Sequence, residues 1–108
     1  MGRDETAVEY KVILSEAARQ MLIEHIQFLA HEDVDAARRI KGVLLDSIRS
    51  LSCFPARHSY ISADFLPANK YRKMVIEKRY LILYQVKEQI VFIDWIMDCR
   101  QDYRWLIR

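Results

Sequence analysis

The fold is decided by residues 70–103, which read KYRKMVIEKRYLILYQVKEQIVFIDWIMDCRQDY. Three runs rich in β-branched and aromatic residues occupy positions 71–76, 80–86 and 90–97, and the charged segments EKR and KEQ separate them. Runs of this composition, bounded by polar turns, predict consecutive β-strands. The middle run is almost continuously apolar, which is typical of a central strand covered on both faces.

Two helices are predicted upstream of these strands. Apolar residues recur at helical spacing over residues 16–30, and the hydroxyl of Ser15 can cap the first turn. A second apolar stripe follows over residues 36–51, where Asp33 or Asp35 can act as the cap. The short turn between them predicts an antiparallel helical hairpin. Because glycine costs about 1 kcal/mol in a helix interior, we expect Gly42 to mark close packing between the two helices.

An alternating, β-rich segment over residues 8–14 predicts a first strand ahead of the helices. The order of elements is therefore β-α-α-β-β-β. This order predicts an α+β fold, in which the helical hairpin packs on one face of a mainly antiparallel sheet of about four strands. A chain of 108 residues suits one domain, so residues 1–108 are expected to form a single unit.

The formal net charge of +2 hides an asymmetry along the chain. Residues 1–36 hold three basic and eight acidic residues, whereas residues 37–108 hold fourteen basic and seven acidic residues. One interpretation is that the basic part of the chain binds an anionic partner. The other is that the charges lie on a solvated surface and cluster by chance.

Several function classes are not expected from this sequence. Cys53 and Cys99 are far apart and no Cys/His cluster accompanies them, so we expect small buried residues and no metal or other cofactor. With Gly2 and Gly42 as its only glycines, the chain has no glycine-rich phosphate loop, and HExxH, EF-hand and GxSxG motifs are absent. No signal-peptide pattern and no apolar run of about 18 residues is visible, which favours the cytoplasm and no membrane partner.

Basic and aromatic residues gather near the expected rim of the sheet. Lysine and arginine neutralise phosphates, and aromatic rings stack on bases. Cleavage of RNA without a metal needs a base, an acid and cations that stabilise the transition state, and Arg, Lys and Tyr can supply these roles. Ordinary charges at strand ends would give a similar pattern. The set comprises Lys70, Tyr71, Arg72, Lys73, Lys78, Arg79, Tyr80, Arg100, Tyr103, Arg104 and Trp105.

Residues 71–106 resemble the C-terminal half of toxins of the RelE/ParE superfamily. The similarity lies in the YLILYQV core of the middle strand and in an Arg-x-Asp-Tyr tail at positions 100–103. The upstream strand, the helical hairpin and the Phe54-Pro55 pair fit the same pattern. The resemblance implies a toxin of a bacterial type II toxin–antitoxin module. Its partner would be a cognate antitoxin with a segment that folds on the toxin, covering the sheet and the hairpin.

The RelE-like branch of this superfamily enters the ribosome and cleaves mRNA, so the resemblance first implies a metal-independent mRNA endoribonuclease that blocks translation. Its partners would be the ribosome and mRNA. The residues expected to be catalytic are Arg79, Arg100 and Tyr103. Those expected to bind nucleic acid are Lys70, Arg72, Lys73, Lys78 and Arg104.

Two positions leave alternatives open. Leu81 stands where the ribonuclease branch often has an arginine, and Met74 stands where a second lysine would help. The ParE-like branch inhibits DNA gyrase and needs no catalytic residues, so it is the main alternative. A degenerate toxin that only binds its antitoxin is another.

Overall fold

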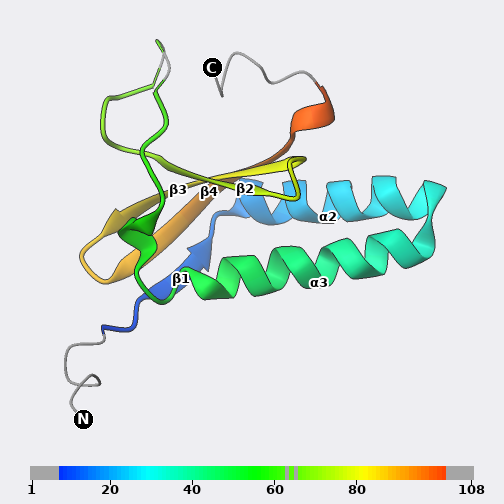
Figure 1. Ribbon diagram of the computed structural model, residues 1–108, viewed down its shortest axis with the longest axis horizontal. Coiled ribbons are helices and arrows are strands. Elements are labelled where there is room, and N and C mark those ends of the chain that lie inside the picture. The colour runs from blue at the N-terminus through cyan, green and yellow to red at the C-terminus, as the bar shows by residue number, and fades with distance from the viewer. Residues whose placement is uncertain (1–7, 63, 65, 102–108) are drawn as a thin grey trace.

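The computed structural model describes residues 8–62, 64 and 66–101, and it confirms the predicted α+β fold. Helices and strands follow one another in the expected order (Figure 1). The elements are β1 (Lys11–Leu14), α2 (Glu16–Glu32), α3 (Val34–Ser50), the 3-10 turn η1 (Pro55–Arg57), β2 (Arg72–Ile76), β3 (Tyr80–Lys87), β4 (Ile90–Asp98) and the 3-10 turn η2 (Cys99–Gln101).

The sheet is mixed, with strand order β1-β4-β3-β2. The pairs β2–β3 and β3–β4 are antiparallel, whereas β1 runs parallel to β4. The first strand is shorter than predicted, because its pairing with β4 begins only at Lys11 and ends at Leu14. Just before it, the backbone N–H of Tyr10 donates to the carbonyl of Ser52 instead.

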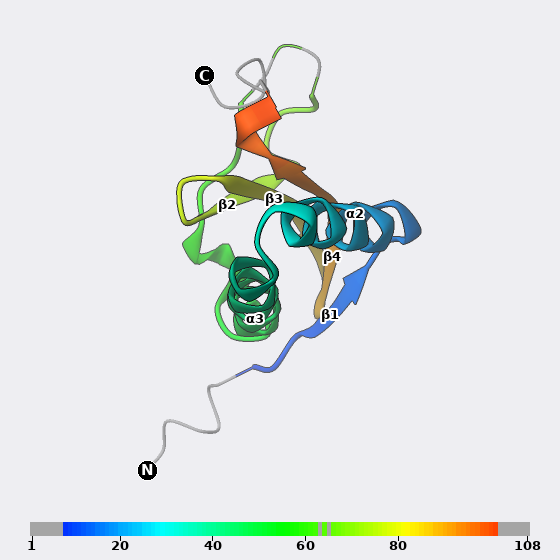
Figure 2. The same ribbon diagram turned by 90° about the vertical axis from the view of Figure 1, so that its right-hand side faces the viewer.

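Both helices begin at the caps that the sequence predicts. The Ser15 hydroxyl accepts from the N–H of Ala18 at 3.0 Å, and the Asp33 carboxylate accepts from the N–H of Ala36 at 3.0 Å. These bonds satisfy donors that have no partner inside the helix. The two helices form the expected hairpin beside the sheet, and Figure 2 looks nearly along them.

The middle strand is buried on both faces, as predicted. Residues 80–84 of β3 are fully buried. Tyr80, Ile82 and Tyr84 pack in the main core beneath the helices, whereas Leu81 and Leu83 join a smaller core on the other face. The loop that connects η1 to β2 covers this second core with Ile61 and Leu66.

The prediction for Gly42 is wrong. Gly42 is exposed, and a Cβ atom placed on it would meet no atom within 4 Å. The residues of α3 that face the core are Ala37, Ile40, Leu44 and Ile48. Since position 42 falls on the opposite side of that stripe, no packing requirement inside the chain explains this glycine.

The two cysteines are free thiols. Cys99 is partly buried, whereas Cys53 is exposed in the segment after α3, so the expectation that it is buried is wrong. None of the described helices combines the length and the apolar character that crossing a bilayer would require.

Candidate functional site

A buried ion pair joins the start of β3 to the end of β4. Arg79 Nη2 lies 2.9 Å from Asp98 Oδ2, and Arg79 Nε lies 3.2 Å from Asp98 Oδ1. The side chains are only 15% and 3% exposed. Asp98 Oδ1 also accepts the backbone N–H of Arg100 at 3.0 Å, so one carboxylate fixes both the strand ends and the turn η2.

The charges of this pair stabilise each other. Burial alone would raise the pKa of Asp98, but the hydrogen bonds from Arg79 and from the N–H of Arg100 outweigh it, and the pKa lies below its ordinary value. The hydrogen bond to Asp98 raises the pKa of Arg79. Both groups therefore stay ionised, and the guanidinium is already neutralised by a partner inside the chain.

Tyr80 contacts both this ion pair and helix α2. The guanidinium carbon of Arg79 is 5.0 Å from the centroid of the Tyr80 ring, and the ring of His25, a residue of α2, has its centroid 5.8 Å from the same point. His25 Nε2 lies 2.7 Å from the carbonyl oxygen of Ile96. The pairing of β4 with β1 ends at Ile93, so Ile96 lies in the part of β4 that β1 does not reach. The Tyr80 hydroxyl is buried without a hydrogen-bond partner among the described residues, and burial raises its pKa.

A second basic group lies at the start of β2. Arg72 Nη1 donates to the carbonyls of His58 at 2.6 Å and Ala56 at 3.2 Å, and its guanidinium carbon stacks 4.0 Å from the centroid of the Tyr60 ring. Arg72 thus ties the loop after α3 to the sheet. Beneath it, the Tyr84 hydroxyl donates to the carbonyl of Pro55, and burial raises the pKa of Tyr84 to about 12.

Two lysines flank this second group. Lys70 Nζ lies 5.4 Å from the centroid of the Tyr71 ring, and Tyr71 stacks on Trp95 with 6.3 Å between ring centroids and 9° between planes. The Lys73 side chain is half-buried and makes no hydrogen bond or ion pair with another described residue.

The structure therefore divides the predicted site residues into two groups. Lys78, Arg79 and Arg100 lie where β3 begins, with Lys78 exposed in the turn at a φ of 55°. The other group, Lys70, Arg72 and Lys73, lies at the far end of β2, about 13 Å along the strand at about 3.3 Å per residue. Tyr103 and Arg104 lie outside the described residues. The roles assigned to all these residues stay predictions.

Asp98 was not predicted from the sequence as the partner of Arg79. The signal in the sequence was a carboxylate, Asp98, at the end of an apolar strand, together with the basic residues of the EKR turn at positions 77–79. Asp94 lies inside the same apolar strand, which predicts either a partner or a solvent-facing position. The structure provides a partner, because Gln85 Nε2 donates to Asp94 Oδ2 at 2.8 Å. Among the residues described, no group of three or more His, Cys, Asp or Glu is placed to hold a metal ion.

Leu81 and Met74, the two departures from the ribonuclease pattern, are core residues. Leu81 is fully buried, and Met74 is 5% exposed beneath the helices. A lysine or arginine at either position would place an unpaired cation in the core. Both positions therefore serve packing and offer no contact with a phosphate.

Comparison with known proteins gives a family and a fold. A family model described as the ParE toxin of the type II toxin–antitoxin system parDE matches residues 12–103. A solved structure of a chromosomal ParDE system from P. aeruginosa aligns with a TM-score of 0.70, covering 83% of this chain and 96% of that chain. The two sequences are 11% identical, so this likeness supports the fold alone. A search of curated proteins finds no match.

Proposed function

This chain belongs to the ParE toxin family of type II toxin–antitoxin systems, and from that premise we propose that it is a non-nucleolytic toxin that inhibits DNA gyrase. Membership in this family implies a cognate antitoxin as its partner. The target and the absence of RNA cleavage are the parts of the proposal that go beyond family membership.

The observation that carries the proposal is the Arg79–Asp98 ion pair. A cation that stabilises the transition state of RNA cleavage must reach the phosphate. Arg79 instead directs Nε and Nη2 at a carboxylate and leaves only 15% of its side chain exposed. Releasing it would leave Asp98 buried and unpaired, at a cost of about 3 kcal/mol or more.

The surroundings of the pair also argue against acid–base chemistry. A general base must lie within hydrogen-bond reach of the proton that it removes. His25 is the histidine next to Tyr80, and its Nε2 is already 2.7 Å from the Ile96 carbonyl. The Tyr80 hydroxyl is buried, and its raised pKa disfavours the phenolate. A toxin that acts by binding alone requires neither group.

Cleavage of mRNA on the ribosome is the second candidate, and one observation favours it. Lys78 and Arg100 lie at the same end of the sheet, their side chains are exposed, and neither forms an ion pair with a described residue. Two exposed cations at one end of the sheet are suited to contact phosphates.

The two candidates differ in which synthesis stops first in the cell. The chain is induced from a tightly repressed promoter, and the incorporation of labelled thymidine, uridine and methionine is followed together. Gyrase inhibition predicts an early loss of DNA synthesis, with an SOS response and filamentous cells. An early loss of protein synthesis with mRNA cut within codons would overturn the proposal, and so would growth at the normal rate.

The Arg100→Ala variant makes the same experiment sharper. If mRNA is cleaved, removing the exposed guanidinium beside the ion pair should lower toxicity strongly, since one transition-state donor is worth about 100-fold or more in rate. Lys87→Ala is the matched control, because Lys87 is another exposed cation, at the other end of β3. If the chain acts on gyrase by binding, we expect the toxicity of the two variants to differ little.

A further inference from the structure

Phe54 combines high exposure with a strained backbone. Its side chain is 76% exposed, more than that of any other large apolar residue in the described part of the chain. Its φ of 48° and ψ of 57° lie in the left-handed region, which bulky L-residues rarely adopt. Pro55 follows, and a proline restricts the backbone of the residue before it. The sequence therefore keeps an aromatic residue where glycine or asparagine would fit the backbone better.

The backbone on both sides of Phe54 is held by hydrogen bonds from side chains. Arg57 Nη1 donates to the carbonyls of Cys53 at 2.5 Å and of Phe54 at 3.1 Å. On the other side, Pro55 is buried, and its carbonyl accepts from the Tyr84 hydroxyl. Strained residues persist only where the surrounding structure fixes them, and they cluster at functional sites. The segment thus presents one aromatic ring on a backbone that is fixed in advance.

The Phe54 side chain adds little to the fold. Apolar side chains stabilise a fold in proportion to the area that they bury, and this ring stays largely in solvent. A single exposed apolar residue is ordinary on a protein surface. An exposed residue that also carries backbone strain is not, because burial of the ring does not compensate the free energy of the strain. The side chain therefore has a use outside the fold.

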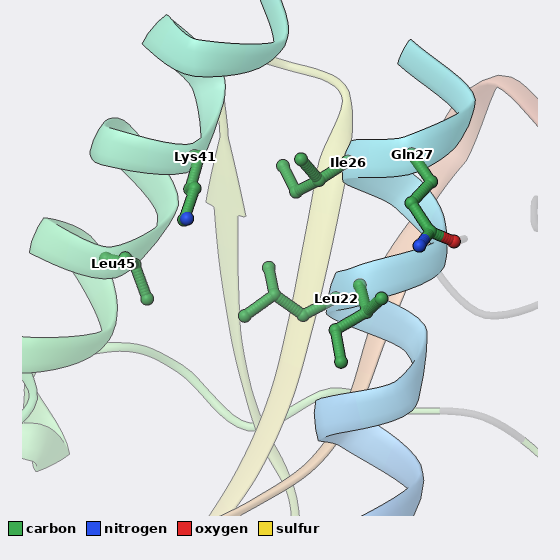
Figure 3. A pocket seen from close by; sticks show the side chains of 6 residues that line it. Leu22, Ile26, Gln27, Lys41 and Leu45 are labelled. Atoms are coloured by element: carbon green, nitrogen blue, oxygen red, sulfur yellow. The ribbon is translucent and has the colours of Figure 1, made fainter. Parts of the chain in front are cut away.

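The apolar groove between α2 and α3 has the opposite shape. Figure 3 shows Leu22 and Ile26 projecting into it from α2, while Lys41 and Leu45 border it from α3. A groove of this kind, with a volume of about 210 Å³, receives apolar groups of a partner. Phe54 instead projects from the chain, so it needs a partner with an apolar cavity that exists before binding. Such cavities belong to folded domains, since a peptide segment without a core of its own encloses none.

We propose that Phe54 is an anchor that inserts into a preformed apolar pocket on DNA gyrase. This inference rests on the proposed function, in which the chain inhibits gyrase by binding alone. Aromatic side chains that enter fully desolvated pockets carry much of the binding energy of protein interfaces. A backbone that is already fixed lowers the entropy cost of placing such an anchor. Because the strain is present in the free chain, binding does not have to create it.

The test measures the concentration of purified chain that halves DNA supercoiling by purified gyrase. We expect Phe54→Ala to raise this concentration by about 30-fold or more, the effect of removing an interface hot spot. Phe28→Ala is the matched control, because Phe28 is an aromatic residue of α2 that is 50% exposed and lies in a regular helix. It should change the concentration by less than about fivefold.

The Phe54→Asn variant separates binding from folding. Asparagine tolerates the left-handed conformation, so this variant should melt at a temperature no lower than that of the wild type. It should nevertheless inhibit gyrase as weakly as Phe54→Ala does, because it lacks the ring. A residue kept only for the fold would give the reverse, a lower melting temperature with full inhibition, and that result would overturn the proposal.

The remaining outcomes tell this inference apart from the proposed function. Full inhibition by both Phe54 variants would overturn the inference and leave gyrase inhibition standing. An equal loss in Phe28→Ala would also overturn it, since the effect would then belong to exposed aromatic surface in general. So would a Phe54→Ala variant that inhibits gyrase fully but no longer binds the antitoxin. A wild type that leaves supercoiling unaffected would overturn the proposed function and this inference together.

Discussion

Two regions of the molecule differ in whether their charges are buried and paired or exposed and unpaired. Where β3 begins, Arg79 and Asp98 are nearly buried and neutralise each other through three hydrogen bonds. On the helical hairpin, Glu24 of α2 and Lys41 of α3 are exposed and have no ion-pair partner in the described part of the chain. The first pair belongs to the fold, whereas the two hairpin charges are exposed to solvent.

This contrast also separates stability from function. Removing one member of a buried pair leaves an uncompensated charge in the interior, whereas an exposed charge can be changed at little cost to the fold. Substitutions at the strand end should therefore lower the free energy of unfolding, and substitutions of the exposed hairpin charges should leave it nearly unchanged.

The largest effect is expected for Asp98→Asn. The neutral amide leaves the Arg79 cation largely buried without its counter-charge, and we expect a loss of about 3 kcal/mol in the free energy of unfolding. Urea denaturation followed by circular dichroism measures it. Lys41→Glu is the control on α3, where we expect a change within about 0.5 kcal/mol because Lys41 is exposed. Equal losses in the two variants would remove the distinction between the regions.

The pH dependence of stability should follow the same carboxylate. The pKa of Asp98 is lowered in the folded chain, so the unfolded chain takes up this proton first as the pH falls. The stabilisation is complete above the ordinary aspartate pKa of about 4 and is lost as the pH falls through the lower folded value. Denaturation of the wild type and Asp98→Asn over pH 2 to 7, the range in which carboxylates titrate, should give curves that converge at the acid end. Curves that stay parallel would show that the ion pair does not lower the pKa of Asp98.

Gly42→Ala is expected to stabilise the chain by about 1 kcal/mol. The glycine is exposed inside α3, its Cβ site is empty, and alanine has the higher helix propensity. Thermal unfolding of the purified chain measures the gain. A loss of stability would mean that the helix around position 42 packs more closely than the structure shows.

The smallest effect on stability is expected for Ile23→Ala. Because 42% of Ile23 is exposed on α2, its truncation should cost less than about 1 kcal/mol. Leu44→Ala on α3 is the matched aliphatic truncation, and a fully buried leucine should cost about 3 kcal/mol. Equal losses in the free energy of unfolding, measured by urea denaturation, would show that Ile23 packs in the core as Leu44 does.

The sequence was sufficient for the fold because its signals are local. The caps at Ser15 and Asp33, the stripe of α3 and the apolar run of β3 each depend on residues close together in the chain. The parallel pairing of β1 with β4 joins residues 79 positions apart, and no local pattern encodes it. The prediction for Gly42 failed because a glycine in a helix indicates close packing only where it faces a neighbouring element.

The candidate site was less predictable than the fold. Composition located the cations of residues 70–79, but it gave no account of which of them are already paired. Arg79 is neutralised by Asp98, 19 residues away, and Arg72 is bound by carbonyls of the preceding loop. Such long-range partners appear only once the strands are in register.

The most direct test of the account adds the purified chain to two reconstituted reactions. One is DNA supercoiling by gyrase, and the other is translation on ribosomes with the mRNA ends mapped by primer extension. If the chain is a non-nucleolytic ParE toxin, we expect gyrase to lose its supercoiling activity and the mRNA to stay intact at the same toxin concentration. Cleaved mRNA together with unaffected supercoiling would contradict it.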